Sequence, residues 1–274
     1  MIPILFNGNK KIFEGLLLST ISLAENTKEP LTIYVMTMDL SDENPNFLPF
    51  TDEQMEVLDV VLKKRNKDSN VIKFDATKEY IENLREGKNH KNGYTPYAAM
   101  RLLLDLIPNA DIPDKLIYLD IDTMCISDIK QLYDIDIEDY DVAAVRDHMA
   151  KWWKYYNYCN SGVMLLNFKR IKENGLFDKC RKLVFKKKLL MPDQSAINRY
   201  AKKKYIPRKF NEQRKIHPDT VVKHFCEGVK YYPPFWFHVF NIKQWQRDKI
   251  HKSKITIFDK YYDEVDELKT KYDF

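Results

Sequence analysis

The sequence predicts an α/β protein built on a parallel sheet with helices on its faces. Short apolar runs rich in β-branched and aromatic residues alternate with longer helical segments, beginning with a βαβ unit over residues 2–36. A later apolar run, at the start of residues 115–126, is predicted to be a short buried strand that ends in two carboxylates. Ligands bind at that edge of open α/β sheets, so the same stretch also predicts the functional site.

The first βαβ unit is predicted from three segments. The apolar residues 2–6 form the first strand and are followed by the turn signal NGN. Dense apolar residues at 12–23 predict a buried helix, and residues 31–36 form the second strand. After a polar loop with several prolines, Thr51 suits the N-cap of a helix that runs to about residue 64.

The middle of the chain continues this alternation. Thr95 and Pro96 predict the start of a helix, because threonine caps helices and proline is favoured in the first turn. The other predicted elements are strands at residues 71–74, 141–145 and 163–167, a basic amphipathic helix at 177–190, and a helix that begins after Met191. Residues 151–158 are unusually aromatic, which fits a packed surface loop, or else a lid or a platform for a sugar.

Composition limits the class of protein. With 274 residues, 44% of them hydrophobic, the chain can bury a full core, and no apolar run approaches the roughly 20 residues of a membrane-spanning helix. The amino-terminal MIPILF is too short an apolar stretch for a signal peptide, so we expect a cytoplasmic protein. Four cysteines without a CxxC pair argue against zinc ribbons and redox motifs.

The composition changes after residue 200, where a cationic run at residues 202–215 precedes aromatic segments broken by prolines. We therefore expect an α/β core at residues 1–200 and a basic, aromatic segment at 201–274 that folds back on it and ends in a basic helical tail. Basic and aromatic residues together also suit single-stranded nucleic acid. However, the formal charge of +5 is small, and a charge run is usually a solvated surface.

Two aspartates, Asp120 and Asp122, lie at the end of the strand that opens residues 115–126. In an extended segment these positions project to the same side, so both carboxylates can reach one cation. Oxygen ligands suit Mg²⁺ or Mn²⁺, which often bind one or two carboxylates together with phosphates. Aspartates are also common in turns, where the side chain hydrogen-bonds to nearby backbone. The first hypothesis is therefore a metal and diphosphate site at the strand end.

Five motifs carry a resemblance to a known family; in chain order they are YLDID, YCNSGVMLLN, PDQSAIN, RKFNEQ and FHVFNIKQW. Together they resemble glycosyltransferase family 8, the retaining nucleotide-sugar transferases that include glycogenin and bacterial lipopolysaccharide galactosyl- and glucosyltransferases. The resemblance implies a single Rossmann-like domain of GT-A type with a mixed, mostly parallel sheet. It also implies transfer of glucose or galactose from a UDP-sugar, with Mn²⁺ or alternatively Mg²⁺. The implied acceptor is a glycan, lipid-linked, protein-linked or cell-envelope molecule.

The resemblance also implies metal ligands. Asp120 and Asp122 match the family's DxD motif, which holds Mn²⁺ against the nucleotide diphosphate. The third ligand in the family is a histidine before a KPW-like motif, which residues 243–245 match as KQW. The spacing to that motif makes His238 the preferred ligand, and His224 is its rival.

Further positions match family residues that contact the donor, with Lys243 expected to hold the diphosphate. The matches to donor-sugar positions are Arg101, Asp147, Asn160, Asp193 and Gln194. Among these, Gln194 with Asp193 beside it is the candidate catalytic group near the anomeric carbon. The other predicted substrate contacts are Asn7, Ile121 and Asn241. The loop after the first strand departs from the family pattern of an acidic pair and a tyrosine, which leaves Asn7 to contact a uracil edge.

Two other interpretations concern the aspartates and the basic surface. LDIDT after an apolar strand also fits the nucleophile motif of HAD-like phosphatases, with Asp120 attacking phosphorus and Asp122 as general acid/base. That motif normally lies near the start of its domain, and no convincing acidic partner follows here. The cationic stretches at 177–190 and 202–215 predict peripheral contact with an anionic membrane on its inner face, rather than nucleic-acid binding.

Overall fold

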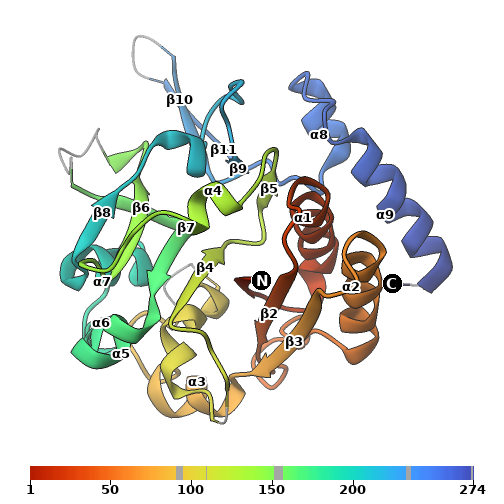
Figure 1. Ribbon diagram of the computed structural model, residues 1–274. Helices are drawn as coiled ribbons and strands as arrows, with labels where there is room; N and C mark the ends of the chain where they lie inside the picture. The colour runs from red at the N-terminus through yellow and green to blue at the C-terminus, as the bar shows by residue number, and fades with distance from the viewer. Residues whose placement is uncertain (91–94, 109, 151–156, 233–235, 273) are drawn as a thin grey trace.

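The computed structural model describes residues 1–90, 95–108, 110–150, 157–232, 236–272 and 274, which form a seven-stranded sheet flanked by helices (Figure 1). In their order across the sheet, the strands are β3 (Asn70–Asp75), β2 (Leu31–Thr37), β1 (Ile2–Asn7), β4 (Lys115–Leu119), β7 (Cys159–Asn167), β6 (Val142–Arg146) and β8 (Lys203–Tyr205). β7 runs antiparallel to both of its neighbours, and the other neighbouring strands are parallel. The expected mixed, mostly parallel sheet is confirmed.

Two apolar cores lie on the two faces of this sheet. Along β1, Ile4 and Phe6 belong to one core and Leu5 to the other, because alternate side chains of a strand point to opposite faces. The first core is covered by α1 (Phe13–Asn26) and α2 (Asp52–Arg65). The second is covered by α3 (Thr77–Asn83), the 3₁₀ helix η2 (Pro96–Leu106), α5 (Phe168–Asn174), α6 (Leu176–Lys186) and α7 (Pro192–Tyr200). The short helices η1 (Lys10–Ile12), α4 (Lys130–Tyr133) and η4 (Arg208–Phe210) complete the connections.

The predicted elements are observed with some shifted ends. β7 begins at Cys159, before the predicted strand, and α6 ends at Lys186 instead of residue 190. The side chain of Asn89 accounts for this end, because its Nδ2 donates to the carbonyls of Val184 and Lys187 and its Oδ1 accepts from Leu189 N at 2.8 Å. Most of the aromatic segment, residues 151–156, lies outside the described residues.

The chain after residue 200 belongs to the same folded unit as the main sheet. β8 extends the main sheet beside β6, and β9 (Val222–His224) pairs antiparallel with β5 (Thr123–Cys125), directly after the two aspartates. A hairpin follows, formed by β10 (Gly228–Tyr232) and β11 (Trp236–Phe240). The last helices are α8 (Arg247–Lys252) and α9 (Asp259–Tyr272).

α9 packs against α1 and α2, as Figure 1 shows. Glu264 pairs with Arg65 at 2.6 Å and with Lys64 at 3.0 Å, and the Tyr262 hydroxyl donates to Gln244 O at 2.6 Å. The sequence of α9, DKYYDEVDELKTKY, has more acidic than basic side chains, whereas that of α8, RDKIHK, has more basic ones. Among the described helices, none is long and apolar enough to cross a membrane.

Candidate active site

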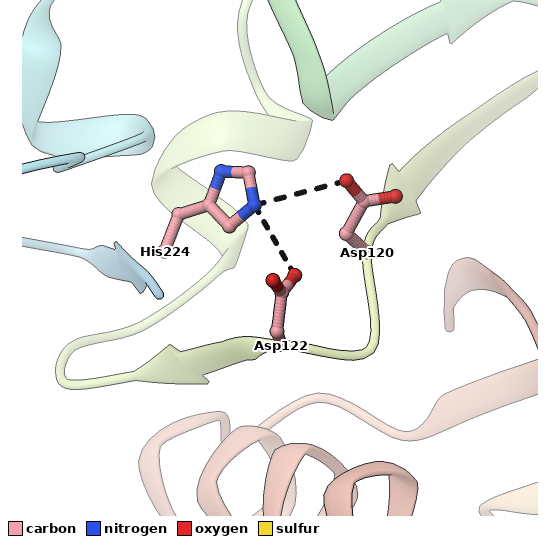
Figure 2. Close-up of side chains that lie close together, drawn as sticks. All are labelled: Asp120, Asp122 and His224. Atoms are coloured by element: carbon pink, nitrogen blue, oxygen red, sulfur yellow. Dashed lines mark ion pairs between the residues drawn. The ribbon is translucent and has the colours of Figure 1, made fainter. Parts of the chain in front are cut away.

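Asp120, Asp122 and His224 converge at the carboxyl end of β4 (Figure 2). His224 Nε2 lies 3.2 Å from Asp122 Oδ1 and 3.7 Å from Asp120 Oδ2. One ligand atom from each residue falls within 4.8 Å of the other two. The pairing of Thr123 with His224 between β5 and β9 brings the histidine, a hundred residues later in the chain, to the aspartates. Two carboxylates and an imidazole at these separations form a candidate metal site.

Gly162 permits this close approach. A Cβ atom at residue 162 would lie 2.2 Å from His224 Cε1 and 2.7 Å from Asp120 Oδ2, closer than real Cβ contacts. The main chain is also fixed here, because Asp120 N donates to Gly162 O at 2.7 Å and Phe225 N donates to Asp122 O at 2.8 Å. The glycine of the NSG sequence is therefore part of the site, since any side chain would push the ligands apart.

The second oxygen of each aspartate is held by a cation. Asp120 Oδ1 accepts from Arg101 Nη2 at 2.9 Å and from the Tyr118 hydroxyl at 2.6 Å. Asp122 Oδ2 pairs with Lys243 Nζ. Each aspartate thus keeps one oxygen, Asp120 Oδ2 and Asp122 Oδ1, turned toward His224.

These partners shift the pKa values in the site. Burial alone would raise the pKa of Asp122, but His224 and Lys243 outweigh it and hold that pKa well below its ordinary value. Burial lowers the pKa of Lys243, but Asp122, together with Asp120 and Cys226, reverses that effect and raises it. Burial lowers the pKa of Arg101, but Tyr118, Asp120 and Asp193 reverse that effect and raise it. At neutral pH the site therefore holds ionised Asp122 beside charged Arg101 and Lys243.

A second polar cluster adjoins the first at the start of β7 and of α7. Gln194 Oε1 accepts from Ser161 N at 2.9 Å, and Gln194 Nε2 donates to Asp147 Oδ2 at 3.2 Å. Asn160 Nδ2 donates to the same oxygen at 3.0 Å. Asp193 Oδ2 accepts from Ser161 Oγ at 3.3 Å, and burial raises the pKa of Asp193. The structure thus brings together four of the predicted sugar-binding residues.

Arg101 connects the two clusters. Its guanidinium is buried over the Tyr118 ring, with Cζ 4.0 Å from the ring centre. Nη2 binds Asp120 as described, Nε lies 3.4 Å from Asp193 Oδ2, and Nη1 donates to Ser161 O at 2.6 Å. A guanidinium has five N–H donors in a rigid plane, which suits such simultaneous contacts.

The remaining predicted residues lie at the edges of these clusters. Asn7 is buried at the end of β1 and donates to Tyr97 O at 3.4 Å. The buried side chain of Ile121 lies against Gly8, where a Cβ would be 2.5 Å from Ile121 Cδ1. Asn241 is exposed between β11 and Lys243. His238 pairs through its main chain with Lys230, and its side chain lies outside the described residues. The described cluster contains His224, and the preference for His238 stays a prediction.

The sequence-based prediction missed Asn211, Ser161 and Tyr118. Asn211 is buried, and its Nδ2 lies 2.9 Å from Asn160 Oδ1 while its Oδ1 lies 3.1 Å from His224 Nδ1. Asn211 lies within RKFNEQ, one of the five motifs of the resemblance. The motif alone does not indicate which of its residues has a role in the site.

Known proteins share this fold and sequence pattern. The model of the family described as "Glycosyl transferase family 8" matches residues 3–231, which is most of the chain. This chain belongs to glycosyltransferase family 8. The predicted enzyme class, a glycosyltransferase, is thereby confirmed, and the phosphatase interpretation of Asp120 is not favoured.

Two curated relatives of this family 8 enzyme cover much of its length. General stress protein A of Bacillus subtilis is 26% identical, over 70% of this chain and 83% of that protein. A Haemophilus influenzae protein, named by class alone as a glycosyltransferase, is 25% identical over 97% of this chain and 83% of its own.

Solved structures show the same fold. The galactosyltransferase LgtC, crystallised in complex with donor and acceptor sugar analogs, has a TM-score of 0.64 at 18% identity, and the match covers 96% of this chain and 94% of LgtC. The glycosyltransferase GlyE of Streptococcus pneumoniae gives 0.65 at 16% identity, covering 96% of this chain and 63% of that one.

Proposed function

We propose that this family 8 enzyme transfers glucose or galactose from a UDP-sugar to a glycan acceptor with retention of configuration, using Mn²⁺. The observation that carries the proposal is the convergence of Asp120, Asp122 and His224 beside the cluster around Gln194, with Arg101 contacting both. A cation site for a diphosphate next to a polar cluster for a sugar is the arrangement that this transfer requires.

The three ligands fit Mn²⁺. Carboxylate oxygens suit hard divalent cations, and an imidazole nitrogen favours Mn²⁺ over the alternative, Mg²⁺, which prefers oxygen. Asp120 Oδ2, Asp122 Oδ1 and His224 Nε2 would hold the cation. When bound, it would act as a Lewis acid that neutralises the charge growing on the leaving diphosphate.

Lys243 is assigned to the diphosphate. Its ammonium group is paired with Asp122 Oδ2 and donates to Phe225 O at 3.3 Å. The raised pKa keeps this group charged at neutral pH. Because the lysine stem is flexible, the ammonium can exchange Asp122 for a phosphate oxygen within the same site.

The donor sugar is assigned to the second cluster. Asp147, Asn160 and Asp193 offer acceptors and donors that suit sugar hydroxyl groups, and Arg101 adds a fixed positive charge. Gln194 is proposed as the polar group nearest the reacting carbon, with Asp193 next to it in the first turn of α7. These residues bind and orient the sugar, because their own hydrogen bonds hold the side chains in place.

The nucleotide base is assigned to the loop after β1. The buried atoms Asn7 Oδ1 and Asn9 Oδ1 have no hydrogen-bond partner within the described part of the chain. A buried acceptor without a partner is costly, so these oxygens suit a ligand that brings an N–H group, such as uracil. Ile121, between the two aspartates, and Asn241, two residues before Lys243, are retained as predicted substrate contacts.

Peripheral contact with an anionic membrane, and with it a lipid-linked or cell-envelope acceptor, is also proposed. Leu190 is 73% exposed and Phe185 38%, and they flank the exposed residues Lys186, Lys187 and Lys188 at the end of α6. Apolar side chains among lysines suit an anionic lipid surface. Binding to vesicles containing phosphatidylglycerol at low salt, lost in Leu190→Glu, is the expected result. Equal binding to neutral vesicles would contradict the proposal.

The first experiment on the main proposal is calorimetric titration of UDP-glucose and UDP-galactose, with and without Mn²⁺. Binding that requires Mn²⁺ is expected, and the tighter of the two sugars identifies the donor. If neither nucleotide sugar nor UDP binds in the presence of Mn²⁺ or Mg²⁺, the proposed function is wrong. Hydrolysis of the bound UDP-sugar in the absence of acceptor, followed by NMR, then reports the configuration of the released sugar.

A further inference from the structure

The side chain of Asn211 lies between the candidate metal site and the sugar cluster. It is 1% exposed and comes from the segment after η4, whereas both of its side-chain partners, Asn160 and His224, come from strands. Its orientation follows from its neighbours, because main-chain N–H groups can only donate hydrogen bonds.

The direction of each hydrogen bond can be traced from Gly162. Gly162 N donates to Asn160 Oδ1 at 3.0 Å, which fixes that atom as the carbonyl oxygen. The Asn211 atom 2.9 Å from Asn160 Oδ1 must then be the amide nitrogen, Nδ2. Asn211 Oδ1 consequently faces His224 Nδ1 at 3.1 Å and can only accept.

This network fixes the tautomer of His224. Since Asn211 Oδ1 accepts, Nδ1 of the imidazole carries a hydrogen, and the lone pair of a neutral imidazole is on Nε2. Nε2 is the atom that faces Asp120 Oδ2 and Asp122 Oδ1. Second hydrogen bonds of this kind orient metal-binding histidines and raise their basicity.

We propose that Asn211 is a positioning residue that serves both parts of the site, an inference that rests on the proposed function. Through Oδ1 it presents His224 Nε2 to the cation. Through Nδ2 it holds the Asn160 amide so that Asn160 Nδ2 reaches Asp147 Oδ2, which Gln194 Nε2 also contacts. The Asn211 side chain therefore orients His224 through its amide oxygen and Asn160 through its amide nitrogen.

Substitutions of Asn211 separate these two roles. In Asn211→Asp, a carboxylate oxygen still accepts from His224 Nδ1, but the donor to Asn160 Oδ1 is lost. In Asn211→Leu, both contacts are lost within a similar volume. We expect Asn211→Leu to weaken Mn²⁺ binding to the UDP complex by roughly 10–100-fold, as for other second hydrogen bonds to metal ligands.

For Asn211→Asp we expect Mn²⁺ affinity within about threefold of the wild type, because carboxylate partners serve metal-binding histidines equally well. The lost hydrogen bond to Asn160 should instead reduce the preference of this variant for the UDP-sugar over UDP. Mn²⁺ affinity is measured by electron paramagnetic resonance with saturating UDP, and nucleotide affinity by calorimetry. Neither measurement requires turnover. If leucine prevents folding, Asn211→Ser replaces it in the comparison.

The control is Asn89→Ala, which removes another buried amide that holds main-chain groups at the end of α6, away from both clusters. It should lower thermal stability without changing Mn²⁺ or nucleotide affinity. Wild-type Mn²⁺ affinity in Asn211→Leu, or equal losses in the Leu and Asp variants, would overturn the inference and leave the proposed function standing. Failure of the wild type to bind Mn²⁺ with UDP would overturn both.

Discussion

Gln244 donates a hydrogen bond from Nε2 to the main-chain oxygen of Ile121, the residue between the two aspartates. Gln244 is fully buried, and the same Nε2 lies 3.3 Å from Gly15 O in α1. The Tyr262 hydroxyl of α9 in turn donates to Gln244 O. The glutamine that replaces the family's proline therefore ties the aspartate turn to the first and last helices.

Gln244→Ala should lower both stability and cation affinity. Ile121 O would lose its buried side-chain donor and Gly15 O would lose a longer contact, which is expected to cost about 1–3 kcal/mol in the free energy of unfolding. Urea denaturation measures this loss, and Mn²⁺ titration with UDP measures the effect on the site. Gln131→Ala, on the exposed surface of α4, is the control and should change neither. If the urea midpoint of Gln244→Ala equals that of the wild type, Gln244 does not hold the aspartate turn to the two helices as proposed.

Asp120→Asn and Asp122→Asn should each abolish most transfer activity while the protein remains folded. Each change removes one anionic ligand of the proposed cation, and loss of several kcal/mol of charge stabilisation corresponds to roughly 1,000-fold in rate. Initial rates with UDP-glucose or UDP-galactose and circular dichroism melting curves provide the two measurements. If either folded variant keeps most of its turnover, the assignment of the cation site is wrong.

His224→Ala and His238→Ala distinguish the two candidate histidines. Loss of His224 should weaken Mn²⁺ binding by at least about 100-fold, because it removes a proposed ligand atom itself and not only a residue that hydrogen-bonds to a ligand. His238→Ala should retain wild-type affinity. Mn²⁺ titration followed by electron paramagnetic resonance reports both variants on one scale, and the opposite pattern would restore His238 as the ligand.

The stability contributed by Asp122 should depend on pH. Its pKa in the folded protein is held below the unfolded value by His224 and Lys243, so the folded state favours the ionised carboxylate. That contribution is fully present above the unfolded value of 3.8 and is lost as the pH falls toward the folded value. In a chelating buffer, the melting temperature of the wild type should exceed that of Asp122→Asn at pH 7. The difference should shrink below about pH 4; a constant difference would exclude this linkage.

The sequence predicted the sheet and named most residues of the polar cluster around Gln194, because these depend on local signals. Strand periodicity placed β4, and the DxD spacing placed both aspartates on one side of the chain. Asp193 and Gln194 lie in the first turn of a helix that Pro192 announces. Their convergence with Asn160 and Asp147 follows from the order of β4, β7 and β6 in the sheet.

The position of His224, the proposed third ligand, could not be predicted in the same way. Its position depends on the antiparallel pairing of β5 with β9, two three-residue strands that carry no periodic signal. The β10–β11 hairpin, which contains His238, lies between His224 and Lys243. Asn211 was missed because a buried amide between two strands is recognised only from its partners.

The two ends of the β10–β11 hairpin lie together in the fold. Gly228 and Phe240 are paired across the two strands, so the chain enters and leaves the hairpin at one place. A hairpin of this kind can be lengthened, shortened or exchanged while its two ends stay together. The hairpin can therefore be exchanged while His224 and Lys243 keep their places, and such an exchange would test whether it controls which molecules approach the site.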